Sequence, residues 1–339
     1  EDIRALLKEA QRPLFFFDDD PDGLSSFLLL YRLAREGKGV IVKSSPELKE
    51  EYLKSYEEYG PDLVVILDKP MVSKELLDGV SCPVIWIDHH EPQNRKKVKY
   101  YNPRKHDDKD NRPTSYWCWQ IVKEDSPEDI WIAMAGCVGD WFLPEFAPAF
   151  IAKYPQLLSP DVKRVEDALF ASKIGLLSRV FSFLLKGKTS EAMKCVKIMT
   201  RVERPEEILD QTTAQGAFVW KRFKKTHEEY SGLLHTACEN AGDDLFLVFT
   251  YSEKQTSFTS DLSNELLYRF PEKVILICRS KSGEMKCSLR SAKYALPQRI
   301  EQALKGLEGY GGGHEHACGA CVREDQFPEF LEKLKESFK

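Results

Sequence analysis

The sequence predicts an α/β protein in three parts: an N-terminal doubly wound, mainly parallel sheet, a helical connector and a smaller C-terminal α/β domain. Three observations predict this organisation. From residue 13 to about residue 142, short apolar runs alternate with amphipathic segments, as expected for parallel strands joined by crossover helices. Charged helical patterns replace the strand signals over residues 144–241, and strand signals return beyond residue 242. We therefore expect domains at residues 1–143, 144–241 and 242–339.

The individual elements follow from the apolar periodicity of each part. In the first domain, strands are expected at residues 13–17, 39–43, 62–67 and 83–87, and helices at 24–35 and 46–59. In the connector, helical patterns cover residues 161–185 and 205–241. In the last domain, strands are expected at 244–251, 273–279 and 284–289, and helices at 260–270, 297–307 and 326–338.

Length and charge narrow the class of protein. A chain of 339 residues exceeds the usual size of a single core, which favours more than one domain. The net charge of -5 argues against a protein that coats long nucleic acid through an overall basic field, so a nucleic acid would meet a local basic patch. No apolar run reaches the roughly 20 residues of a membrane span, and residues 1–10 form a charged amphipathic helix rather than a signal peptide. We therefore expect a cytoplasmic protein that does not bind membranes.

Acidic residues follow the first predicted strand directly. Four carboxylates occupy the five positions from Asp18 to Asp22, and a helix is predicted to begin after Gly23. Negative charges this close repel one another strongly unless cations neutralise them. For this segment alone, a solvated acidic turn in which an aspartate caps the next helix is the alternative explanation.

The same pattern recurs at later strand ends. The strand at 62–67 is followed by Asp68, the strand at 83–87 by Asp88, His89 and His90, and the apolar segment 130–139 by Asp140. Because ligands of open α/β sheets bind at the carboxyl ends of the strands, these side chains are expected to converge. Carboxylates with one or two imidazoles suit a pair of divalent ions. We expect Mn²⁺ in preference to Mg²⁺, since magnesium favours shells made of oxygen alone.

A glycine-rich segment near the C-terminus is the second candidate site. Gly311, Gly312 and Gly313 would let backbone amides approach a phosphate or a base closely, and His314 would add a donor. A glycine-rich turn between a helix and a final strand is the alternative. Arg290, at the end of a predicted strand, could pair with a phosphate through its forked donors, although an isolated arginine is usually only solvated.

These motifs resemble a known superfamily. The series Asp18-x-Asp20-x-Asp22-Gly23, then Asp68, then Asp88-His89-His90, then Asp140 resembles the four motifs of the DHH phosphoesterases. The segment from Gly311 to Gly319, with Cys287 to Ser291 before it, is similar to the DHHA1 substrate-binding domain of the same superfamily. Some branches of the superfamily have a histidine at or near the first motif position, whereas this chain has Asp18, as RecJ-like nucleases do.

The resemblance implies a role for each matching residue. Asp18, Asp20 and Asp68 would hold one metal ion. Asp22, Asp68, His89 and Asp140 would hold the other, so that Asp68 bridges the two ions. Asp88 would orient the neighbouring histidine, and His90 would lie near the scissile phosphate. Arg290, Gly311, Gly312, Gly313 and His314 would bind substrate.

We therefore expect a two-metal phosphodiesterase, most simply an exonuclease on single-stranded DNA, RNA or short oligonucleotides, similar to RecJ-like and nanoRNase-like members. Two alternatives remain. The chain could be a replication-accessory protein that binds the GINS complex and the replicative helicase, or it could hydrolyse linear or cyclic dinucleotides.

Overall fold

The computed structural model describes residues 2–43 and 46–339 and divides into two compact units. Unit 1 covers Glu1–Lys224 and unit 2 covers Lys225–Lys339. The boundary falls inside a long helix, α12 (Ala214–Glu239). The expected fold class is confirmed, because unit 1 contains a parallel sheet followed by helices and unit 2 contains a mixed sheet. The division into three domains stays a prediction.

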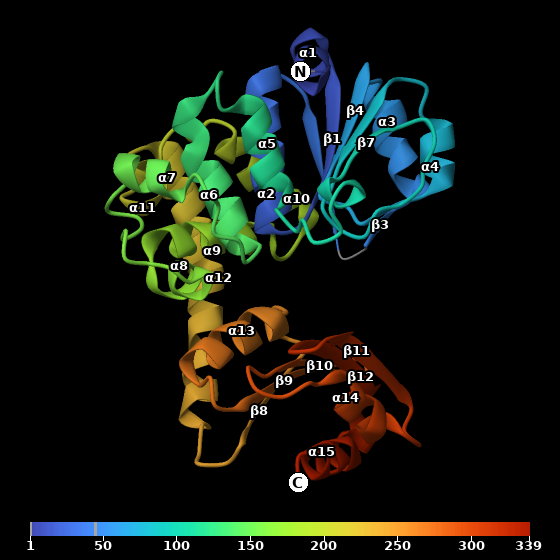
Figure 1. Cartoon of the computed structure of the whole chain (residues 1–339), viewed down its shortest axis with the longest axis vertical. Helices are drawn as coiled ribbons and strands as arrows, with labels where there is room; N and C mark the ends of the chain where they lie inside the picture. The colour runs from blue at the N-terminus through green and yellow to red at the C-terminus, as the bar shows by residue number, and fades with distance from the viewer. Residues whose placement is uncertain (1, 44–45) are drawn as a thin grey trace. The chain divides into compact units, whose positions relative to one another are not determined.

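Unit 1 is built on a five-stranded parallel sheet in the order β2-β1-β4-β6-β7 (Figure 1). The central strands are continuous apolar runs, which is typical of strands covered on both faces. Four strands match the predictions, and they are β1 (Pro13–Asp18), β2 (Lys38–Val42), β4 (Leu63–Leu67) and β6 (Val84–Ile87). The fifth, β7 (Lys99–Tyr101), was not predicted, since it is short and partly exposed at the sheet edge.

Helices cover both faces of this sheet (Figure 1). On one face, α2 (Pro21–Ala34) places Phe27 with its ring stacked on Phe17 at 4.6 Å and edge-on to Phe15 at 5.5 Å. On the other face lie α3 (Leu53–Tyr59) and α4 (Lys74–Gly79), against a core that includes Phe16. The expected helix at 46–59 was wrong over its first part. That stretch forms β3 (Glu47–Leu48), which pairs with β5 (Met71–Val72), and a turn of 3-10 helix (Glu50–Tyr52), because Leu48 is drawn into the core.

The rest of unit 1 is helical. The expected N-terminal helix is α1 (Asp2–Glu9), with residue 1 outside the described part. The expected helix at 161–185 is broken at Ser172, whose hydroxyl accepts from the Gly175 amide and caps a new helix. The helices after the sheet are α5 (Thr114–Val122), α6 (Ile130–Gly139), α7 (Ala147–Lys153), α8 (Val165–Ala171), α9 (Lys173–Leu185), α10 (Thr189–Met199) and α11 (Pro205–Leu209).

In the described part of the chain, no single helix combines the length and apolar character that a membrane span requires. Only α8 and α9 taken together reach that length and composition, and they are bent by 73° with respect to each other. The apolar residues of α9, such as Leu177 and Phe181, are buried in the core of unit 1.

Unit 2 contains a five-stranded sheet in the order β11-β12-β10-β9-β8, in which only β8 and β9 are parallel. Helices α14 (Pro297–Leu304) and α15 (Phe327–Glu336) pack on one face, and α13 (Thr259–Arg269) covers β9 and β10 on the other (Figure 1). Three strands match the predictions, and they are β8 (Phe246–Tyr251), β9 (Val274–Lys281) and β10 (Glu284–Arg290). The glycine-rich segment forms a strand of its own, β11 (Gly309–His314), at the sheet edge beside β12 (Ala317–Arg323).

Candidate metal centre and substrate face

The acidic residues of unit 1 meet at the carboxyl edge of its sheet. Phe17 pairs with Leu67, and Leu67 pairs with Ile87, so the residues that follow these three positions leave the sheet side by side. Two helix ends add to the same edge. Asp20 is the N-cap of α2, with Asp22 in its first turn, and Asp140 is the C-cap of α6. The convergence expected from the strand ends is therefore observed within unit 1.

His89 joins two groups of potential metal ligands. Its Nε2 atom lies 3.5 Å from Asp68 Oδ1 and 3.6 Å from Asp140 Oδ2. Within one group, formed by Asp22, His89 and Asp140, all ligand atoms lie within 4.8 Å of one another, and the same holds for Asp68, His89 and His90. The two groups together include Asp22, Asp68, His89 and Asp140, the four residues that were expected to hold one of the two metal ions. Asp18 and Asp20 belong to no such group among the described residues.

The backbone is tightly constrained where it delivers these ligands. Asp68 has a φ of 57°, a left-handed conformation that non-glycine residues adopt rarely and that is typical of functional sites. At Gly23, a Cβ atom would lie 2.6 Å from the Asp18 carbonyl oxygen. Only glycine therefore lets the chain fold back closely enough to bring Asp18, Asp20 and Asp22 together.

Asp22 also anchors the next helix to the site. It is fully buried, and its carboxylate accepts hydrogen bonds from the backbone amides of Thr114 at 2.8 Å and Ser115 at 2.7 Å. These amides lie in the first turn of α5, whose N-terminal partial positive charge stabilises a carboxylate. The contact fixes the orientation of Asp22 within the cluster.

The remaining carboxylates are electrostatically strained. Burial, together with the charges of Asp18 and Asp22, raises the pKa of Asp20 to about 7. Burial likewise raises the pKa values of Asp68 and Asp140 well above their usual range, with added repulsion from neighbouring aspartates. A buried cluster of this kind favours bound cations, and its oxygen and imidazole ligands fit a hard divalent metal ion.

Asp88 was expected to orient His89, but in the structure it contacts His90 instead. Its Oδ1 atom lies 2.8 Å from His90 Nδ1, and Asp88 is fully buried. The Tyr100 hydroxyl and the Asn102 amide each donate to Asp88 Oδ2 at 3.2 Å. Burial acts to lower the pKa of His90, but the hydrogen bond and charge of Asp88 outweigh it and raise the pKa overall.

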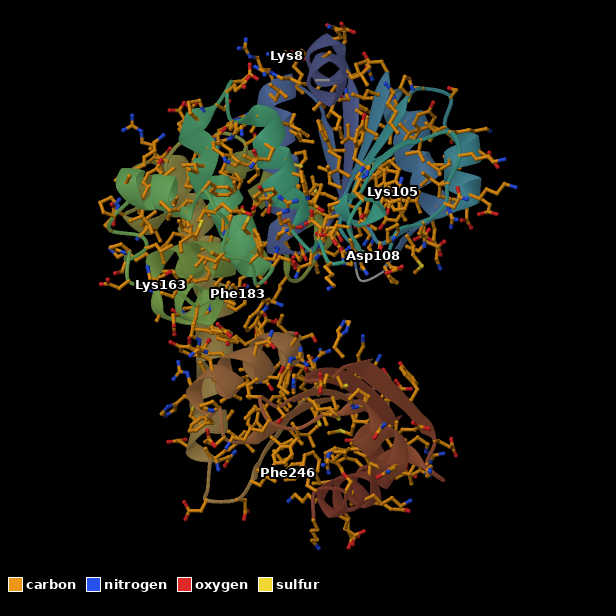
Figure 2. The ribbon with its side chains drawn as sticks, in the orientation of Figure 1. Lys8, Lys105, Asp108, Lys163, Phe183 and Phe246 are labelled. Carbon is orange, nitrogen blue, oxygen red and sulfur yellow. The ribbon has the colours of Figure 1, made fainter. Side chains whose placement is uncertain are left out.

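The loop after β7 supplies the partner of His89. The Asn111 carbonyl oxygen lies 3.3 Å from His89 Nδ1, which directs Nε2 toward Asp68 and Asp140. Lys105 and Asp108, in the segment that follows β7, are labelled in Figure 2, and Asp108 lies at the end of unit 1 away from Lys8 of α1. Backbone carbonyls commonly orient ligating histidines in this way. Asn111 could not be predicted from the sequence, because a contact through a backbone carbonyl does not depend on residue type.

The three glycines predicted to bind substrate lie in different surroundings on β11. A Cβ atom at Gly311 would lie 2.8 Å from the Ile300 side chain of α14, and Gly313 has a φ of +145°. Packing and backbone conformation therefore explain these two glycines. At Gly312, by contrast, nothing lies within 4 Å of an added Cβ atom and the conformation is ordinary. The local fold gives no reason for glycine there.

Gly312 belongs to a flat strip across two strands. It pairs with Gly319 of β12, and directly opposed residues lie on the same face of a sheet. The next residue across, Ser288 of β10, is buried and hydrogen-bonds Ser263 of α13. An added Cβ atom at Gly319 would also be free of close contacts, with its nearest neighbour at 3.7 Å. Exposed His314 and Tyr310 lie on the same face of β11, two residues to either side of Gly312. We call this set of residues, together with Arg290, the substrate face.

Arg290 lies at the border of the substrate face, opposite Ala317. Its guanidinium donates to Asn264 Oδ1 at 2.6 Å, to the Leu289 carbonyl at 2.8 Å and to Ser260 Oγ at 3.2 Å. These partners are neutral, and burial lowers the pKa of Arg290. In the described part of unit 2 no ion pair to a carboxylate is recorded for this guanidinium, so an anionic ligand would complete its environment.

Together, these features define a class: an α/β protein with a candidate divalent-metal centre at the carboxyl edge of a parallel sheet and a second unit with a glycine-lined face. Residues 14–138 match the family described as "DHH family, N-terminal domain", and residues 246–339 match "DHHA1 domain". The chain therefore contains a DHH-family N-terminal domain and a DHHA1 domain. The comparison with curated proteins produced no match.

Solved structures with the same fold include nucleases and a dinucleotide phosphodiesterase. RecJ from Thermus thermophilus in complex with Mn²⁺ has a TM-score of 0.64 at 18% identity, over 99% of this chain and 54% of that protein. A manganese-bound exonuclease RecJ gives 0.58 at 19% identity, over 99% and 93%. PggH from Vibrio cholerae, a pGpG-specific phosphodiesterase, gives 0.57 at 12% identity, over 96% and 97%. The chain thus spans about half the length of the Thermus protein, and these likenesses concern the fold.

Proposed function

We propose that the protein is a divalent-metal-dependent phosphodiesterase that degrades single-stranded DNA, RNA or short oligonucleotides from an end. The observation that carries this proposal is the convergence of Asp22, Asp68, His89 and Asp140 at one sheet edge. Two ions, with Mn²⁺ preferred and Mg²⁺ as a substitute, agree with the ligand chemistry. RecJ structures with the same fold contain Mn²⁺ or Mg²⁺. Bound divalent ions supply Lewis-acid stabilisation of charge at phosphorus and activation of water.

The residues of the chain position the reacting groups. The Asn111 carbonyl and the amides of α5 hold His89 and Asp22 in fixed orientations. Asp88 accepts from His90 Nδ1, so the other ring nitrogen, Nε2, is the atom that would donate to the scissile phosphate. An imidazole protonated on both nitrogens would favour this role, and Asp88 stabilises that form.

The substrate face of unit 2 would bind a nucleotide of the substrate. Gly312 and Gly319 leave a strip without side chains, on which a flat base or a sugar-phosphate backbone could lie. Tyr310, with 70% of its surface exposed, is suited to stack on a base. Arg290 and His314 would bind phosphate oxygens. Dinucleotides are included among the short substrates of this proposal.

The replication-accessory role and the GINS partner stay predictions. The full set of carboxylates supports catalysis, because a protein used only as a scaffold would be free to lose metal ligands. A pull-down with GINS would test that role separately from hydrolysis.

The activity is tested with the full chain on a ladder of labelled DNA and RNA oligomers and on pGpG, with Mn²⁺ or Mg²⁺. We expect stepwise shortening by the wild type and no cleavage by Asp68→Asn. Asp78→Asn is a matched control, since Asp78 is an exposed aspartate paired with Lys97 away from the cluster. If folded wild-type protein cleaves neither an oligomer of any length nor the dinucleotide, the proposal is wrong.

A further inference from the structure

A lysine is buried among the carboxylates of the metal centre. Lys69 directly follows Asp68 and is 1% exposed. Its Nζ atom lies 2.9 Å from Asp18 Oδ1. Lysines are almost never fully buried unless they are paired, so this ion pair accounts for the position of Lys69 inside the protein.

The backbone around Lys69 holds its side chain in place. Asp68 before it has the left-handed φ of 57°, and Pro70 after it restricts Lys69 to extended conformations. The indole Nε1 of Trp86 donates to the Lys69 carbonyl oxygen at 2.9 Å. Trp86 is itself fully buried and stacks on Tyr100 at 3.9 Å. Lys69 is therefore a rigid part of the site.

Lys69 places a positive charge beside Asp18 but not beside the ligands around His89. Asp18 Oδ1 accepts from Lys69 Nζ and from the Asp19 amide, both at 2.9 Å. In the described residues, the ion pairs of Asp68 and Asp140 come from His89 and His90 alone. A fixed positive charge thus accompanies Asp18, whereas in the part of the chain that the structure describes no ammonium or guanidinium group pairs with Asp68 or Asp140.

We infer that Lys69 is a built-in cation that divides the metal centre into a strong position at Asp22, Asp68, His89 and Asp140 and a weak position at Asp18 and Asp20. A divalent ion on Asp18 would lie close to the ammonium group, and like charges in a buried site repel strongly. Among the residues that the structure describes, Asp18 and Asp20 belong to neither ligand group, which agrees with this division. The inference rests on the proposed metal-dependent function and concerns the order in which its ions bind.

The test is a Mn²⁺ titration of the full chain without substrate. Calorimetry measures the affinity of each ion, and electron paramagnetic resonance shows whether the bound Mn²⁺ ions are isolated or coupled. For the wild type we expect the first ion to bind at least about tenfold more tightly than the second and to give the spectrum of isolated Mn²⁺. In Lys69→Met, which keeps most of the apolar stem, the two affinities should converge and an exchange-coupled Mn²⁺ pair should form early in the titration. Lys69→Arg, which keeps the charge, should retain unequal affinities.

Lys97→Met is the control, because Lys97 forms an exposed ion pair with Asp78 outside the cluster. Two equal sites in the wild type would overturn the inference, as would a Lys69→Met protein that melts normally and keeps the wild-type difference. If Lys69→Met does not fold, the wild-type titration alone decides between equal and unequal sites. A wild type that binds no Mn²⁺ would instead contradict the proposed function itself.

Discussion

Replacing neighbouring glycines of β11 by valine should separate stability from substrate binding. At Gly311, the new side chain would meet Ile300 Cγ2 at 2.8 Å and the Gly319 carbonyl at 3.0 Å. Overpacking of this kind typically costs about 1–3 kcal/mol of folding free energy. At Gly312, nothing lies within 4 Å of an added Cβ atom. There, valine should leave stability unchanged or raise it by about 0.5–1 kcal/mol, since glycine is unfavourable within a strand.

Binding should follow the opposite pattern. Gly312→Val projects a branched side chain from the middle of the substrate face, so we expect the affinity for a labelled short oligonucleotide to fall at least about tenfold, which corresponds to about 1.4 kcal/mol. Fluorescence anisotropy measures the affinity, and urea denaturation measures stability on the same samples. Gly232→Ala is the control, since its Cβ atom also meets nothing within 4 Å but lies on α12. Unchanged oligonucleotide binding by a stable Gly312→Val protein would refute the assignment of this face.

Three further substitutions test the remaining parts of the site. Asp140→Asn should remove the tightest Mn²⁺ binding event seen by calorimetry, because Asp140 faces His89; retention of that event would exclude Asp140 as a ligand. Asp88→Asn should lower activity about 10- to 100-fold with little change in oligonucleotide affinity, since it releases His90 Nδ1, and single-turnover assays would separate the two effects. Arg290→Lys keeps the charge but loses the forked donors, and we expect about tenfold weaker oligonucleotide binding. Wild-type affinity in Arg290→Lys would show that Arg290 serves only its contacts to Asn264 and neighbouring carbonyls.

The strands that carry the metal ligands were predictable because they are buried on both faces and therefore read as continuous apolar runs. The exceptions are strands set by tertiary contacts. Residues 47–48 follow a helical pattern, yet they pair with β5 because Leu48 packs into the core. The segment Gly309–His314 contains four glycines in six residues, a composition that disfavours strands, and pairing with β12 imposes the extended form.

Within the site, residue types identified the ligands but not their partners. Asp88 and His90 are two residues apart, so an extended chain points them to the same side and His89 to the other, which explains why Asp88 holds His90. This pairing could have been predicted from the sequence. The burial of Lys69 could not, because most lysines are exposed and its position depends on the hydrogen bond that the Trp86 indole donates to the Lys69 carbonyl oxygen.

The central claim is that Asp22, Asp68, His89 and Asp140 share one divalent ion. The most direct measurement is anomalous diffraction from a crystal of the full chain grown with Mn²⁺, recorded on both sides of the manganese absorption edge. The account predicts an anomalous peak in contact with these four side chains. A well-ordered site with no peak there, or with manganese bound elsewhere in the chain, would contradict it.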